Sequence, residues 1–150
     1  MSRIRRFVRF LTPVAAAVGA VACVVGTPWK RFEPPTGPVL VSITHAVLNP
    51  NARDAFDDYV FVVADAMDRG EIPGLVGYRI RKEVFGDEVW TMSAWRSAKD
   101  LSAFVRSEVH ARAIRAGRGA IVTMTSKRVT LSADEIPLGW DRAEALLADS

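Results

Sequence analysis

The sequence has 150 residues, which is enough for one average domain and too few for two well-formed hydrophobic cores. Its 49% hydrophobic and 25% charged residues exclude a disordered chain, and its single cysteine excludes a disulfide framework or a cysteine-cluster metal site. Four of the 20 lysines and arginines lie in the first nine positions, so the remaining bases nearly balance the 17 acids. We therefore expect no nucleic-acid binding by the body of the protein.

An uncharged run from Phe10 to Trp29 follows this basic cluster. As a helix, the run is about long enough to span a hydrocarbon core of ~30 Å, so residues 1–29 are predicted to form a membrane anchor or signal segment. The positive-inside rule places the arginines in the cytoplasm and the body outside it. Two alternatives stay open, namely export after cleavage of the segment and lipid attachment after cleavage near Cys23.

Prolines mark the start of the folded part. Residues 28–38 contain four of them, and proline supplies no backbone donor. We therefore predict an extended linker over residues 30–38 and a folded domain over residues 39–148.

The domain is predicted to open with a β-branched strand over residues 39–48. A helix should start at Asn49-Pro50 and end at Gly70. Two strands over residues 75–85 and 88–96 then flank Gly86-Asp87, which predicts a hairpin with a two-residue loop.

This hairpin pairing would place Tyr78 opposite Trp95. The other face of the hairpin carries Arg79, Arg81 and Trp90, and it is too aromatic to be left wholly in water. We therefore expect that face to contact another subunit.

Ser97 is predicted to cap a helix that breaks near Ser107 and continues as a short segment up to Gly117. A strand over residues 120–131 and a terminal helix over residues 142–148 complete the chain. The order β-α-β-β-α-β predicts an α+β, ferredoxin-like fold in which both helices cover one face of an antiparallel sheet. The opposite face would be bare, and burying it against a second copy predicts a homodimer.

The segment MSAWRSAKDLSAFVRSEVHARAIR, over residues 92–115, and the turn Pro73-Gly74 resemble the dimeric α+β barrel superfamily. That superfamily includes antibiotic-biosynthesis monooxygenases and small haem-degrading enzymes. A run of the form W-x-S-x-x-x-L-x-x-F-x-x-x-x-x-H makes the segment most similar to spheroidene-monooxygenase-like proteins. The resemblance implies dimerisation and a pocket between sheet and helices, but it does not fix an activity.

His110 is the candidate catalytic residue of that pocket, because an imidazole there could shuttle a proton or ligate haem iron. The expected lining is Tyr78, Trp95, Phe104 and His45. Each also has a structural interpretation, as a hydrogen-bonding residue at a helix break or as part of the core. The sequence carries no metal-ligand cluster, serine-histidine-aspartate set or phosphate loop, and no metal is predicted.

These features predict a membrane-associated monooxygenase-like protein that acts on a small hydrophobic or aromatic molecule. Its cofactor stays open, because oxygenation with haem and oxygenation without a cofactor both fit the residues. The alternative is a non-catalytic dimeric module, tethered to the membrane, that binds a ligand or a partner.

Overall fold

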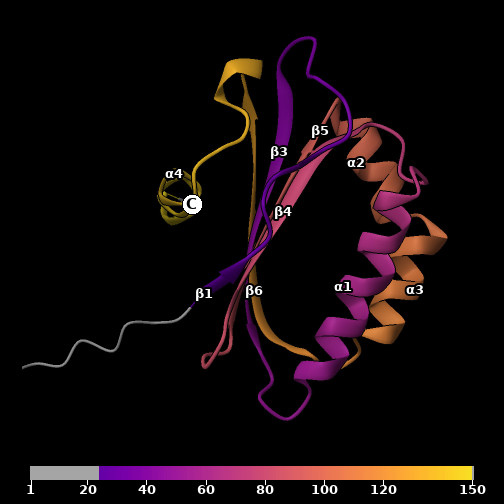
Figure 1. The fold of residues 1–150 in the computed structure, drawn as a ribbon, viewed down its shortest axis with the longest axis vertical. Coiled ribbons are helices and arrows are strands. Elements are labelled where there is room, and N and C mark those ends of the chain that lie inside the picture. The colour runs from indigo at the N-terminus through magenta and orange to yellow at the C-terminus, as the bar shows by residue number, and fades with distance from the viewer. Residues whose placement is uncertain (1–23, 150) are drawn as a thin grey trace, which may run out of the picture.

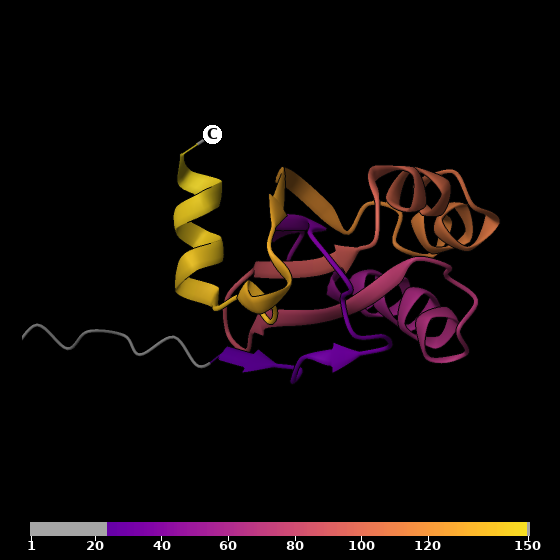
Figure 2. The same ribbon diagram turned by 90° about the horizontal axis from the view of Figure 1, so that it is seen from above.

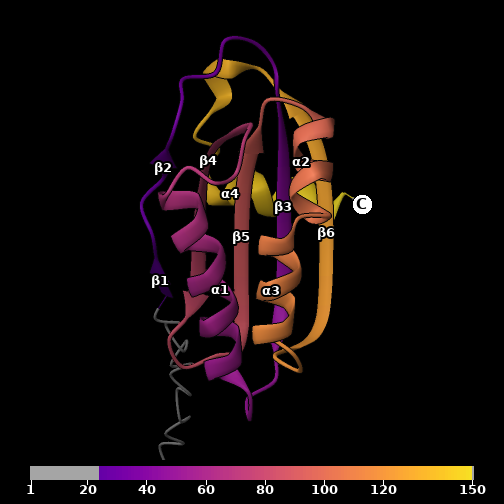
Figure 3. The same ribbon diagram turned by 90° about the vertical axis from the view of Figure 1, so that its right-hand side faces the viewer.

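A six-stranded sheet forms the centre of the computed structural model, which describes residues 24–149 (Figure 1). Its main elements are, in chain order, β3 (Val39–Leu48), α1 (Arg53–Asp68), β4 (Leu75–Glu83), β5 (Glu88–Trp95), α2 (Ala98–Val105), α3 (Glu108–Ala116) and β6 (Ile121–Leu131). The strands lie in the order β4-β5-β3-β6, and all neighbours are antiparallel. The predicted ferredoxin-like fold is therefore confirmed. Helices α1, α2 and α3 all cover the same face of the sheet (Figure 3).

Two serine caps divide the second helical region. The Ser97 Oγ accepts a hydrogen bond from the backbone N–H of Asp100 at 3.2 Å, at the start of α2. The Ser107 Oγ accepts one from the backbone N–H of His110 at 3.2 Å, at the start of α3. Each cap satisfies a helix donor that would otherwise lack a partner, so the predicted break near Ser107 is confirmed.

Helix α1 ends as predicted and starts later than predicted. Gly70 follows the helix with φ of +71°, a left-handed conformation that glycine adopts without strain. At the other end the Asn49 Oδ1 accepts a hydrogen bond from the Asn51 backbone N–H at 3.0 Å. This local turn takes up the asparagine, and the helix starts only at Arg53.

The hairpin of β4 and β5 has a longer loop than predicted. Tyr78 lies opposite Ser93, so the predicted pairing with Trp95 is wrong. The loop spans residues 84–87 instead of two residues, which shifts the register by two. Since side chains alternate with a period of two, this shift keeps them on their predicted faces. Val76 does not follow the alternation from Tyr78, because a register irregularity beside it turns its side chain to the face that packs under α4.

The C-terminal segment covers the centre of the other sheet face. A 3-10 turn, η1 (Ala133–Glu135), leads into α4 (Trp140–Ala148), which lies on the opposite side of the sheet from α1–α3 (Figures 1 and 2). The residues buried between this segment and the sheet include Val39, Val41, Ile43, Ile136, Leu138 and Ala143. The expectation that this face is bare is therefore wrong at its centre, where the chain covers the face itself.

The N-terminal part of the described chain extends the sheet. Two short strands, β1 (Val24–Gly26) and β2 (Lys30–Arg31), pair antiparallel with the outer edge of β4. The Lys30 Nζ donates to the Asp68 Oδ2 at 2.8 Å and so joins β2 to the end of α1. This ion pair raises the pKa of Lys30.

The predicted membrane helix over residues 10–29 is corrected by these strands. Residues 24–29 form β1 and a short loop instead of the end of a helix. Every helix within residues 24–149 is too short or too polar to span a membrane. The rest of that prediction, including cleavage or lipid attachment near Cys23, falls on residues 1–23, which lie outside the described part of the chain.

Candidate active site

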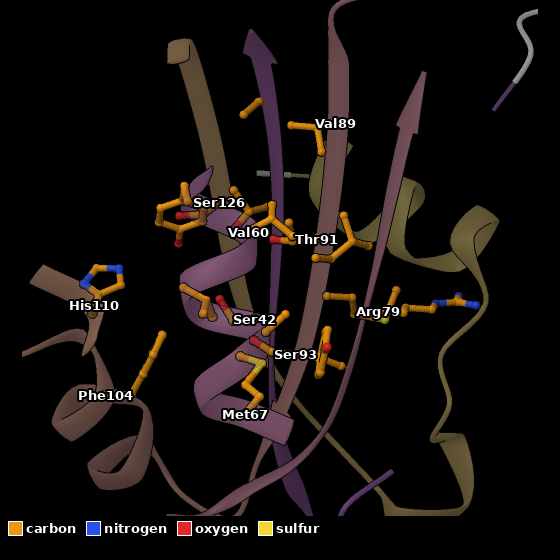
Figure 4. Close-up of a pocket in the computed structure, with 18 of the residues that line it drawn as sticks. Ser42, Val60, Met67, Arg79, Val89, Thr91, Ser93, Phe104, His110 and Ser126 are labelled. Atoms are coloured by element: carbon orange, nitrogen blue, oxygen red, sulfur yellow. The ribbon is translucent and has the colours of Figure 1, made fainter. Parts of the chain in front are cut away.

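A cavity of about 310 Å³ lies between the sheet and helices α1–α3 (Figure 4). This volume is at the small end of the range for small-molecule sites, which is roughly 300–1,000 Å³. Helix α1 covers the cavity with the apolar side chains of Val60, Val63, Ala64 and Met67. Strands β3–β6 form the floor, so an apolar roof faces a sheet surface.

The floor carries hydroxyl groups on three neighbouring strands. Ser126 of β6 lies opposite Thr44 of β3, and Thr44 lies opposite Thr91 of β5. In the adjacent row Ser42 of β3 lies opposite Ser93 of β5. Within residues 24–149, only the Ser93 hydroxyl of this set is hydrogen-bonded to another side chain. The others are available to a ligand.

Aromatic side chains form one wall. The rings of Trp95 and Phe104 stack with their centroids 5.3 Å apart. The indole Nε1–H of Trp95 donates to the Ser93 Oγ at 2.9 Å, which fixes the plane of the ring. Tyr78 is buried beside them and stacks on Phe32 of the N-terminal segment, with 6.0 Å between centroids. A planar ligand could stack against these rings.

His110 borders the cavity where α2 gives way to α3 (Figure 4). Its Nδ1 lies 2.9 Å from the carbonyl oxygen of Val105. Because a carbonyl oxygen can only accept, Nδ1 carries the proton of the neutral ring and Nε2 has a free lone pair. No residue within 24–149 binds this Nε2. The ring also packs edge-on against Phe104, with 5.0 Å between centroids, so its orientation is fixed from two sides.

Four of the five expected pocket residues thus come together around one cavity, namely Tyr78, Trp95, Phe104 and His110. His45 does not line it, and that expectation is corrected. Alternation along β3 turns Ser42 and Thr44 towards the helices and His45 towards the other face. There the His45 ring stacks on Trp90 with centroids 4.2 Å apart.

The described residues that line the cavity include no aspartate or glutamate. The Arg79 side chain is directed away from the cavity in Figure 4, and its guanidinium donates to the carbonyl oxygen of Leu138. Burial raises the pKa of the Tyr59 phenol, which keeps that group neutral. Among the described lining residues, His110 is therefore the side chain whose two ring nitrogens can hold a proton and offer a lone pair at the same time.

Sequence reasoning missed the hydroxyl floor. The signal lay in the first strand, where Ser42 and Thr44 alternate with the fully buried Val41 and Ile43. Polar residues at every second position of a strand point to a polar surface on one face. What that surface faces depends on the helix that packs above it, so the pattern alone does not reveal a cavity.

Comparisons with known proteins bear on the fold. No protein-family profile matches the chain, and neither does any curated protein. A solved structure from Lactobacillus acidophilus, assigned as a monooxygenase, is similar with a TM-score of 0.57 and 11% identity. The similarity covers 73% of this chain and 49% of that one, so this chain spans about half the length of the Lactobacillus protein.

Two shorter structures, both assigned as antibiotic biosynthesis monooxygenases, are similar over nearly their whole length. The protein from Chloroflexus aurantiacus has a TM-score of 0.51 and 20% identity, over 67% of this chain and 94% of that one. The protein from Nitrosomonas europaea has a TM-score of 0.52 and 15% identity, over 73% of this chain and 100% of that one. The narrower resemblance to spheroidene-monooxygenase-like proteins stays a prediction. At these identities the likeness shows a shared fold, the ferredoxin-like fold that these structures also adopt.

Proposed function

We propose that this protein is a monooxygenase that binds a small, flat, mainly apolar molecule in the cavity and oxidises it with molecular oxygen. The observation that carries the proposal is the free Nε2 lone pair of His110 beside a cavity with an apolar roof and an aromatic wall. The shared fold adds support, because several structures with it are assigned as monooxygenases. Fold alone would not be sufficient, since one fold hosts many activities.

The simplest reaction for such a site converts an activated methylene group into a ketone. One oxygen atom of O₂ forms the carbonyl, and the other leaves as water with the two methylene hydrogens. The substrate supplies all the electrons, so no external reductant is needed. His110 would accept the first proton at Nε2, and the resulting carbanion would then reduce oxygen.

The surroundings of His110 suit this role. Its Nδ1–H hydrogen bond to the Val105 carbonyl holds the ring in one tautomer and stabilises the imidazolium that forms. The hydroxyls of Thr44 and Thr91 could donate to an oxygen on which negative charge develops. The stacked rings of Trp95 and Phe104 would orient the substrate.

The cavity as it stands is at the small end of the range for small-molecule sites, which favours a ligand smaller than haem. His110 is the lining residue that would ligate the iron of a haem. The reaction proposed above takes all its electrons from the substrate, so we propose it without a cofactor.

Oxygen uptake tests the proposal. The full chain would be incubated with a panel of fused-ring compounds that carry an activated methylene group, in an oxygen-electrode cell. We expect turnover of at least one compound, and a loss of about 10²- to 10³-fold in rate for His110→Gln, as for removal of a general base. His45→Gln is the matched control, because His45 lies on the other face of the sheet. Equal rates for wild type and His110→Gln would contradict the role of His110.

We also propose that the protein is a homodimer that pairs through β6. The other edge of the sheet is covered by β1 and β2, whereas β6 is a free edge in residues 24–149 (Figure 3). Val122 and Met124 on β6 are 63% and 61% exposed. Exposed apolar side chains on a long free edge favour pairing with another strand.

The alternative function is a non-catalytic module that binds a ligand or partner. It is favoured by the small number of acid–base groups around the cavity, where His110 stands without a carboxylate among the described lining residues. Native mass spectrometry of the purified protein distinguishes the two. Recovery of a bound molecule that oxygen leaves unchanged would support the module, and recovery of its oxidised form would support the enzyme.

A further inference from the structure

One cation faces the cavity without a counter-charge. Arg128 lies on β6 and lines the cavity. Its guanidinium makes no hydrogen bond, ion pair or ring contact with another residue in 24–149. An arginine in a binding site has five N–H donors in a fixed fork, so an unpaired one is suited to receive an anionic group.

The register of the sheet places Arg128 at the end of a polar row. It lies directly opposite Ser42 of β3, Ser42 lies opposite Ser93 of β5, and Ser93 lies opposite Tyr78 of β4. All four residues line the cavity. The row therefore runs from the cation of Arg128 on the edge strand β6 to the aromatic ring of Tyr78 on β4.

The described residues that line the cavity carry positive charge and no negative charge. The described lining has no carboxylate, and its other guanidinium, that of Arg79, is directed away and bound to a carbonyl. Lys127, the residue before Arg128, belongs to the opposite face by strand alternation, and its Nζ donates to the Asp149 carbonyl oxygen at 3.2 Å. The positive charge on the cavity side of β6 thus belongs to Arg128.

We propose that Arg128 binds a carboxylate on the ligand, so that the ligand class is an apolar carboxylic acid. The inference rests on the proposed ligand-binding function of the cavity. A carboxylate matches the guanidinium fork with two parallel hydrogen bonds. In the single chain Arg128 is exposed, so a carboxylate bound there keeps part of its hydration while the apolar body of the ligand is buried under α1. Burying the body in this way avoids the cost of fully desolvating a charge.

The test uses two probes of the same shape, 2-naphthoate and 2-naphthamide, titrated into the full chain at low salt. Binding is followed by calorimetry. We expect wild type to bind the carboxylate at least about tenfold more tightly than the amide, a typical value for a charged hydrogen bond. The preference should be lost in Arg128→Gln and reduced in Arg128→Lys, which keeps the charge but not the fork. It should also shrink as salt is added.

Lys127→Gln is the matched control, because it removes one positive charge from the adjacent position on the opposite face. Retention of the preference in Lys127→Gln, with loss in Arg128→Gln, supports the proposal. Equal affinity of wild type for both probes, or an unchanged preference in Arg128→Gln, overturns it and leaves the cavity as a neutral binding site. Failure of both probes to bind at all would count against the proposed ligand-binding function as well.

Discussion

The indole of Trp140 lies over the guanidinium of Arg79, with 4.4 Å between the ring centroid and Cζ. The Arg81 Cζ is 4.9 Å from the same ring and 5.3 Å from the ring of Trp90. Arg81 also forms an ion pair with Glu144 of α4. Arginine and tryptophan side chains from β4, β5 and α4 therefore stack in alternation. These contacts attach the C-terminal helix to the sheet face that was expected to contact a second subunit.

Trp140→Ala should release this attachment. The substitution removes packing and the cation–π contacts of both arginines, so we expect a loss of about 2 kcal/mol in unfolding free energy. Chemical denaturation measures it. Phe85→Ala is the control, because that ring is 85% exposed at the hairpin tip and its loss should cost less than about 0.5 kcal/mol. Equal effects of the two substitutions would contradict the attachment of α4 by Trp140.

Gly77→Ala should disturb the N-terminal segment. A Cβ at Gly77 would lie 2.6 Å from the Trp29 ring and 2.6 Å from the Lys30 carbonyl oxygen, and the backbone atom cannot swing away. We expect a destabilisation of about 1–3 kcal/mol, as for overpacking in a core. Gly37→Ala is the control, because nothing lies within 4 Å of a Cβ there. The midpoint of thermal unfolding reports both, and an unshifted midpoint for Gly77→Ala would mean that β2 does not pair with β4.

Alkaline stability should depend on Tyr59. Burial raises the pKa of its phenol above 10.0, the ordinary value for a tyrosine side chain. A group with a raised pKa in the folded state stabilises the fold fully below its unfolded pKa, and this contribution is lost as pH rises through the folded value. Wild type should therefore lose more stability than Tyr59→Phe between about pH 8 and pH 11. Thermal melts at both pH values check this, and parallel losses would show that Tyr59 ionises as freely in the folded protein as in the unfolded one.

Val122→Lys should weaken the proposed dimer. A lysine on a free edge strand opposes pairing with another strand, and it would sit in the apolar part of β6. Sedimentation equilibrium over micromolar concentrations should show wild type as a dimer and the variant shifted towards monomer. Phe61→Lys on α1 removes an exposed apolar side chain away from β6 and should remain dimeric. A dimer that tolerates Val122→Lys would place the interface elsewhere.

Local signals in the sequence predicted the elements that depend on neighbouring residues. Ser97 and Ser107 are each followed by a helix whose first donors they satisfy, and that relationship is contained within four residues. Gly70 ends α1 for an equally local reason. The order of these elements was then sufficient to predict the ferredoxin-like fold.

Features that depend on distant residues could not be predicted in the same way. Residues 24–29 have the apolar composition of a membrane segment, and only pairing with β4, more than 50 residues away, makes part of them a strand. The position of α4 likewise depends on Trp140 meeting Arg79 and Arg81, which precede it by about 60 residues. The cavity depends on both layers, because the hydroxyls of β3 form a floor only beneath α1.

Indole NMR signals provide the most direct measurement of whether the cavity between sheet and helices is the ligand site. Of the four tryptophans, Trp95 lines the cavity, whereas Trp90 and Trp140 lie on the opposite face of the sheet. Titration of ¹⁵N-labelled protein with 2-naphthamide should shift the Nε1–H signal of Trp95 and leave those of Trp90 and Trp140 in place. Shifts of Trp90 and Trp140 with an unmoved Trp95 would put the ligand beneath α4 and contradict the account.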